Sequence, residues 1–149
     1  MKLADRPWNP KRPDQFVDRG HPAGDFLEAY DWKVLEREVG RYRIDAHLPQ
    51  KCKNPRGALF GGFTPTYIDL LAVYTVRSRF PDGDYMILTL NMRVDYLAPV
   101  RSDRFLLESR IVHAKDRVSL VEVQILDHER ELLVTSLVTL RKSDGPKPT

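Results

Sequence analysis

A glycine pair followed by an aspartate is the pattern in this chain with the clearest potential for chemistry. Gly61 and Gly62 precede a stretch with helical spacing, and Asp69 lies within that stretch. Glycines at a helix start can leave backbone N–H groups free to bind an anion or a developing oxyanion. A carboxylate about two turns along the same helix could activate water or attack a carbonyl carbon. The alternative is structural: a tight turn that needs glycine, and an aspartate that is either a satisfied polar group or exposed on the helix surface.

The other candidate nucleophiles and metal ligands form no comparable pattern. Cys52 is the only cysteine, so it can form no disulfide within the chain, and multi-cysteine metal sites are excluded. His21, His113 and His128 have no partner at metal-ligand spacing, and we expect no metal. No serine stands in a G-x-S-x-G motif, and the glycine pair lacks the lysine of a phosphate-binding loop.

The stretch from Gly57 to Arg79 is predicted to contain one long helix. Its apolar residues recur at the spacing of one helix face: Phe63, Tyr67, Leu70, Leu71 and Tyr74. Pro65 leaves two starts open. The helix could begin at Gly61, with Pro65 at the end of its first turn, or Thr64 could be the N-cap and Pro65 the first helical residue.

Strands are expected on both sides of this helix. The candidates are residues 32–39 and 41–48 before it, and 86–97, 104–113, 117–126 and 131–141 after it. Short polar connections between the later strands predict antiparallel neighbours. A curved antiparallel sheet of five to six strands that wraps one central helix is the economical packing, which makes the fold class α+β.

The strand predicted over 86–97 alternates between apolar and polar residues. One face is expected to carry Met86, Leu88, Leu90, Met92, Val94 and Tyr96. The opposite face is expected to carry Thr89, Asn91, Arg93 and Asp95.

The run from residue 54 to residue 62, followed by an aspartate, resembles the signature of hot-dog acyl-CoA thioesterases. The nearest branch is the PaaI-like group of the 4-hydroxybenzoyl-CoA thioesterase superfamily. The family pattern has an asparagine, then Gly-x-x-His-Gly-Gly, then an aspartate eight residues after the first glycine of the pair. The matching positions here are Asn54, Gly57, Gly61, Gly62 and Asp69. Residues 89–99 are similar to the family's next strand, and the resemblance covers about residues 25 to 141.

The resemblance implies a hot-dog fold that hydrolyses an acyl-CoA thioester to the free acid and coenzyme A. It assigns the oxyanion site to the Gly61 N–H and the general base or nucleophile to Asp69. It assigns the orientation of water or of the thioester to Asn54 and Thr89. It also implies a homodimer or a dimer of dimers, with Asn54 and Gly61 from one subunit and Asp69 and Thr89 from its mate. No cofactor is expected besides the coenzyme A of the substrate.

Further residues are candidates for binding the substrate. Phe60, which replaces the histidine of the family pattern, and Gly62 lie at the predicted helix start. Arg101, Lys115 and Arg117 lie in turns beside the last strands, where they could bind the phosphates of coenzyme A or be ordinary surface charges.

Phe63, Tyr67 and Tyr74 could line a tunnel for the acyl group or belong to the core.

Three functions stay open, and the first is hydrolysis of an acyl-CoA thioester. The replacement of the family's histidine by Phe60 keeps open a hot-dog module that binds acyl-CoA without cleaving it. A dehydratase or hydratase acting on a hydroxyacyl thioester is the third reading, and it usually needs a histidine paired with a carboxylate.

Composition sets the remaining expectations. The chain has 149 residues, 42% of them hydrophobic and 30% charged, with a net charge of +3, which suits one domain and no nucleic-acid partner. No apolar stretch nears the ~18 residues of a membrane span. No secretory signal is seen, so a cytoplasmic location is expected. We expect a Pro-rich arm over 1–24, the thioesterase domain over 25–142, with a short helix at 25–30, and a tail over 143–149.

Overall fold

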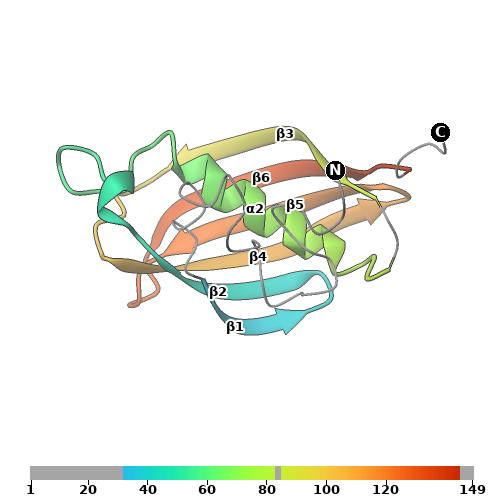
Figure 1. The fold of residues 1–149 in the computed structure, drawn as a ribbon, viewed down its shortest axis with the longest axis horizontal. Coiled ribbons are helices and arrows are strands. Elements are labelled where there is room, and N and C mark those ends of the chain that lie inside the picture. The colour runs from blue at the N-terminus through green and yellow to red at the C-terminus, as the bar shows by residue number, and fades with distance from the viewer. Residues whose placement is uncertain (1–31, 83–84, 145–149) are drawn as a thin grey trace.

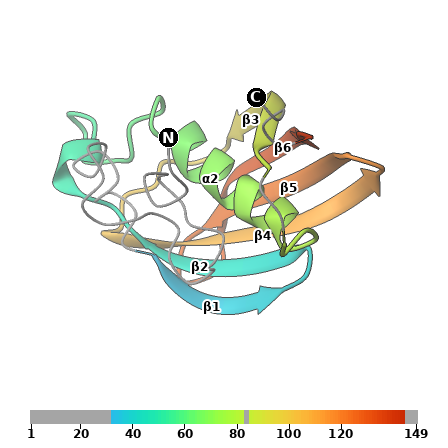
Figure 2. The ribbon, with the colours of Figure 1, turned by 45° about the vertical axis from the view of Figure 1, so that its right-hand side comes forward.

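The computed structural model describes residues 32–82 and 85–144, which form one long helix and a six-stranded antiparallel sheet. The elements are β1 (Lys33–Glu38), β2 (Arg41–His47), the short 3₁₀ helix η3 (Gln50–Cys52), α2 (Thr64–Arg77), β3 (Ile87–Tyr96), β4 (Arg104–Lys115), β5 (Val118–Leu126) and β6 (Leu132–Lys142). Helix α2 lies across one face of the sheet (Figure 1), and the sheet curves around it (Figure 2). The predicted α+β architecture is confirmed.

Some predicted segments lie outside the described residues. These are the Pro-rich arm over 1–24, the short helix over 25–30, and all of the tail except Ser143 and Asp144. The six predicted strands and the long helix all exist, with bounds within a few residues of those expected.

The core lies between α2 and the concave face of the sheet. Tyr67 and Leu71 of α2 are fully buried, and the Tyr67 ring packs edge-on against Phe105 of β4 with 5.1 Å between ring centroids. The Tyr67 hydroxyl donates to the backbone oxygen of His47 at 2.9 Å, so the buried phenol is satisfied. Tyr74 is also buried. The helical spacing of these aromatic residues therefore serves the core.

The strand order β1-β2-β4-β5-β6-β3 differs in one respect from the expected pairing of successive strands. Strands β4, β5 and β6 are successive antiparallel neighbours, as predicted, but β3 pairs with β6 and not with β4. Both edges of β4 are occupied, by β2 on one side and β5 on the other. The chain after β3 therefore crosses to the middle of the sheet, and β3 keeps one edge without a partner strand among the described residues.

A β-bulge in β3 changes which side chains face the helix. Thr89 pairs with Leu140 and Asn91 with Thr139, so Leu90 is an extra residue with no partner on β6. Residues directly opposite each other in an antiparallel pair share a face. Because Leu140 is buried, Thr89 faces the helix side of the sheet.

The regular alternation predicted for this strand is therefore wrong in its first half. Leu88 pairs with Arg141 on the outer face and is 42% exposed. After the bulge, Met92 pairs with the buried Val138 and packs against the core, as predicted. One inserted residue shifts the side-chain phase by one, which a period-two pattern cannot reveal when the inserted residue is itself apolar.

Candidate active site

Asp69 of α2 and Thr89 of β3 are in direct contact. The Thr89 hydroxyl donates to Asp69 Oδ1 at 2.5 Å. Asp69 is partly buried and Thr89 is exposed, so the pair lies at the edge of the helix–sheet contact and not within the core. No other hydrogen bond to the Asp69 carboxylate is found within residues 32–82 and 85–144, which leaves Oδ2 able to accept a proton from water.

The start of α2 differs from both predicted starts. The helix spans Thr64–Arg77, with Phe63 as its N-cap, so Thr64 is the first helical residue and Pro65 the second. The missing N–H of proline costs little there, because the first N–H groups of a helix have no partner within it. Residues 61–63 form a turn that leads into the helix, with Phe63 N and Thr64 N donating to the Phe60 carbonyl at 2.9 and 3.2 Å.

The glycine pair supplies free backbone donors, as the sequence predicted. Neither the Gly61 N–H nor the Gly62 N–H donates a hydrogen bond within the part of the chain that the structure describes. Along a rise of about 1.5 Å per residue, these donors lie on the order of 10 Å from Asp69. A single chain therefore holds the donors and the carboxylate about two helical turns apart.

Phe60 explains why one of the two glycines is needed. A Cβ at Gly62 would lie 2.8 Å from Phe60 Cε1, so the aromatic ring occupies the space that a side chain would take. A Cβ at Gly61 would meet only a ring carbon of Tyr96, at 3.8 Å. The Phe60 ring is 49% exposed and packs edge-on against Phe63, with ring centroids 5.6 Å apart.

Tyr96 is a contact that the sequence analysis missed. Its hydroxyl, from the last residue of β3, donates to the Gly61 carbonyl at 2.6 Å. The alternation of its strand predicts only that Tyr96 lies on the apolar face. The signal that points to it is Pro65: a proline four residues after Gly61 leaves that carbonyl without its helical donor.

Asn54 holds the loop that precedes the glycine pair. Its side-chain oxygen accepts the N–H groups of Arg56 at 2.9 Å and Ala58 at 3.1 Å, and its backbone pairs with Ala58 and Gly57. Gly57 adopts φ +77, a conformation that favours glycine. The Asn54 oxygen is thus used by the loop, and the orientation of substrate by its side-chain NH₂ group stays a prediction.

The three cations predicted to bind phosphate lie apart. Arg101 donates to the Arg56 carbonyl at 2.9 Å, beside the Asn54 loop. Lys115 is the last residue of β4, and Arg117 lies in the turn after it, where it pairs with Asp144. The length of β4 separates the two places by about 35 Å at ~3.3 Å per residue. Within one chain these cations cannot bind the same phosphate.

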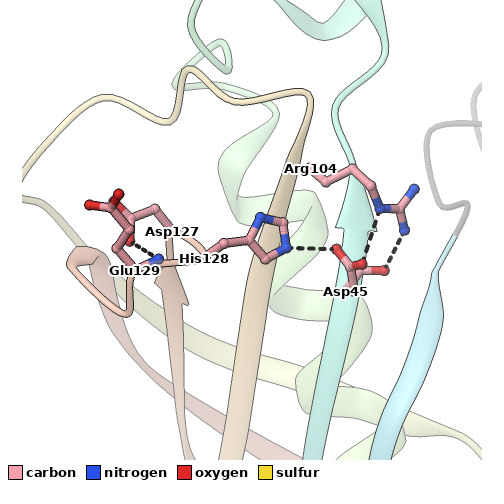
Figure 3. A network of polar contacts seen from close by, with 5 residues as sticks. All are labelled: Asp45, Arg104, Asp127, His128 and Glu129. Atoms are coloured by element: carbon pink, nitrogen blue, oxygen red, sulfur yellow. Dashed lines mark hydrogen bonds and ion pairs between the residues drawn. The ribbon is translucent and has the colours of Figure 1, made fainter.

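The Cys52 thiol is buried, and His128 lies on the other side of the sheet from α2. Burial raises the pKa of the Cys52 thiol, which keeps it protonated and a poor nucleophile. His128 Nε2 lies 3.3 Å from Asp45 Oδ1, and Asp45 also accepts from Arg104 at 3.1 Å (Figure 3). Asp45 alternates with the buried Ile44 on β2, so this network lies on the outer face of the sheet, opposite α2.

The described part of the chain contains neither a metal-binding cluster nor a helix that could span a membrane. Among residues 32–82 and 85–144, no three side chains of histidine, cysteine, aspartate or glutamate are grouped so that they could hold a metal ion. None of the helices described is long and apolar enough to span a membrane.

Comparison with known proteins supports one family. A family model described as the thioesterase superfamily matches residues 56–134. A protein of Saccharolobus solfataricus with the provisional name of an esterase is 25% identical over 104 residues, which cover 68% of this chain and 67% of that protein.

Solved structures share the fold. A protein of Streptococcus mutans bound to acetyl-CoA superposes with a TM-score of 0.69 at 19% identity, covering 78% of this chain and 92% of that one. A Streptococcus pneumoniae protein with coenzyme A, described as a hypothetical thioesterase, gives 0.69 at 17% identity, covering 78% and 92%. One helix packed against a six-stranded antiparallel sheet is thus the hot-dog arrangement of these proteins.

Proposed function

Because the chain belongs to the thioesterase superfamily, we propose that it hydrolyses an acyl-CoA thioester to the free acid and coenzyme A. The contact between Asp69 and Thr89 carries this proposal. It places a carboxylate with one unengaged oxygen at the surface, held by a hydroxyl from a different element. The coenzyme A and acetyl-CoA bound to the structural neighbours support the choice of thioester.

The residues divide the reaction between a base and an oxyanion site. Asp69 takes a proton from water as the water oxygen bonds to the thioester carbonyl carbon, and the free N–H groups of the glycine turn bind the resulting oxyanion. The C–S bond then breaks, the acid is released, and the coenzyme A thiolate takes up a proton. Attack by the carboxylate itself, through an anhydride that water then opens, uses the same two groups. Thr89 holds Asp69 for either route.

A second copy of the chain completes this site in our proposal. The glycine donors and Asp69 lie on the order of 10 Å apart along one chain, a long reach for the groups around one carbonyl carbon. The edge of β3 that has no partner strand in the described chain ends at Tyr96, beside the glycine turn, and exposes Leu90 and Tyr96. Joining two copies at this edge would cover it and bring one copy's Gly61 toward the other's Asp69. Light scattering at micromolar concentration should give at least a dimer, and a stable monomer would refute the shared site.

Thiol release from a panel of acyl-CoA esters tests the activity. Asp69→Asn preserves the shape and removes the base, so kcat should fall by about 10²-fold or more, with KM little changed. Asp95→Asn is the matched control, because Asp95 is on β3 but pairs with Arg93 at 3.1 Å on the outer face. Equal hydrolysis by the wild type and Asp69→Asn would overturn the assignment of the base.

One observation favours a second function. Phe60 occupies the position of the family's histidine with a ring that can neither donate nor accept a proton. A module that binds acyl-CoA without cleaving it would need no imidazole there. Binding of acyl-CoA by calorimetry, with no thiol release from any ester of the panel, would establish this second function in place of hydrolysis.

A further inference from the structure

Pro65 deprives the Gly61 carbonyl of the backbone donor that a helix would supply. In a helix the N–H of a residue donates to the carbonyl four positions before it. Thr64 makes this bond to Phe60 at 3.2 Å, so the helical pattern already extends back over the turn. Pro65 has no N–H to offer Gly61, and its ring crowds the carbonyl at that position.

Tyr96 replaces the missing donor from another element. Its hydroxyl donates to Gly61 O at 2.6 Å, across the gap between the end of β3 and the turn before α2. Its ring also lies beside the glycine, with Cε1 3.8 Å from where a Gly61 Cβ would stand. The bulge at Leu90 makes this possible, because it brings the second half of β3, and Tyr96 with it, onto the helix side.

The same peptide unit carries one of the free donors. The carbonyl of Gly61 and the N–H of Gly62 belong to one planar trans peptide and point in opposite directions. A hydrogen bond that fixes the carbonyl therefore fixes the N–H, and it also polarises that N–H. Without this bond the turn would be held mainly through the Phe60 carbonyl.

We propose that Tyr96 is a positioning residue for oxyanion binding: its hydroxyl orients the Gly61–Gly62 peptide so that the Gly62 N–H points at the thioester carbonyl. This inference rests on the proposed thioesterase activity. It adds Gly62 to the donor predicted from the sequence, the Gly61 N–H, and it assigns Tyr96 no contact with the reacting atoms.

The test asks whether a second substitution that restores a hydrogen-bond donor to Gly61 O also restores kcat. If the Tyr96 hydroxyl only stabilised the fold in general, this substitution would not restore kcat. Tyr96→Phe removes the hydroxyl and keeps the ring, and it should lower kcat about three- to tenfold, the scale of one hydrogen bond, with KM unchanged. Adding Pro65→Ala supplies a backbone N–H that can donate to Gly61 O from within the helix. The double variant should recover most of the lost kcat.

A matched control and a second measurement separate the possible failures. Tyr85→Phe removes another tyrosine hydroxyl that donates to a backbone carbonyl, that of Phe80, and should leave kcat unchanged.

NMR of the full chain should show the Gly62 amide resonance shifting in Tyr96→Phe and returning in the double variant, whether or not any ester is hydrolysed. An inactive wild type with this NMR pattern would overturn the thioesterase proposal but not the positioning by Tyr96. Wild-type kcat in Tyr96→Phe, a loss that Pro65→Ala does not restore, or an unmoved Gly62 resonance would each overturn the inference.

Discussion

Replacing Thr89 by valine tests whether the threonine acts through Asp69 or independently on water. Valine has nearly the shape of threonine but no hydroxyl, so the change deletes the 2.5 Å donor to Asp69 and little else. A hydrogen bond to a charged group contributes about 1.5–3 kcal/mol, and the exposure of Thr89 places this one at the lower end. We therefore expect kcat to fall roughly tenfold, which corresponds to about 1.4 kcal/mol.

The double variant gives the sharper result. If Thr89 only holds the carboxylate, its loss should change kcat less than about twofold once Asp69→Asn has removed the base. The assay is thiol release from the best ester of the panel, at saturating substrate. Thr139→Val on the outer face of β6 is the matched control and should match the wild type. Losses that multiply in the double variant would refute the reasoning and assign Thr89 a role of its own.

Three further expectations concern the turn, the bulge and the loop. In a denaturant titration, Gly61→Ala should keep the wild-type free energy of unfolding. Gly62→Ala should lose about 1 kcal/mol of it, because the new Cβ would lie 2.8 Å from the Phe60 ring. Met92→Ala should cost about 2 kcal/mol and Leu88→Ala less than about 0.5 kcal/mol, and equal costs would contradict the bulge. Iodoacetamide should alkylate Cys52 much more slowly in the native protein than in urea, as mass spectrometry can follow, because burial raises its pKa.

The long helix was predictable because its signal is local. Apolar residues at helical spacing define its face, and a proline near its start is tolerated at the second helical position. The pairing of β3 was not, because which strand lies beside it depends on which edges of the sheet the other strands leave open. The described chain places β3 next to β6, on the far side of the sheet from β1, and not next to the strand that follows it.

The candidate site shows the same division between local and distant information. The residue types and the spacing of Gly61 and Asp69 can be read from the sequence, and they predict free N–H donors and a carboxylate on one helix. Two contacts came only from the tertiary structure: Thr89 to Asp69, and Tyr96 to Gly61. They join side chains of β3 to α2 and to the turn before it, across 20 and 35 residues of sequence. The inserted residue Leu90 lets Thr89 and Tyr96 lie on the same side of β3, and only the pairing with β6 makes this visible.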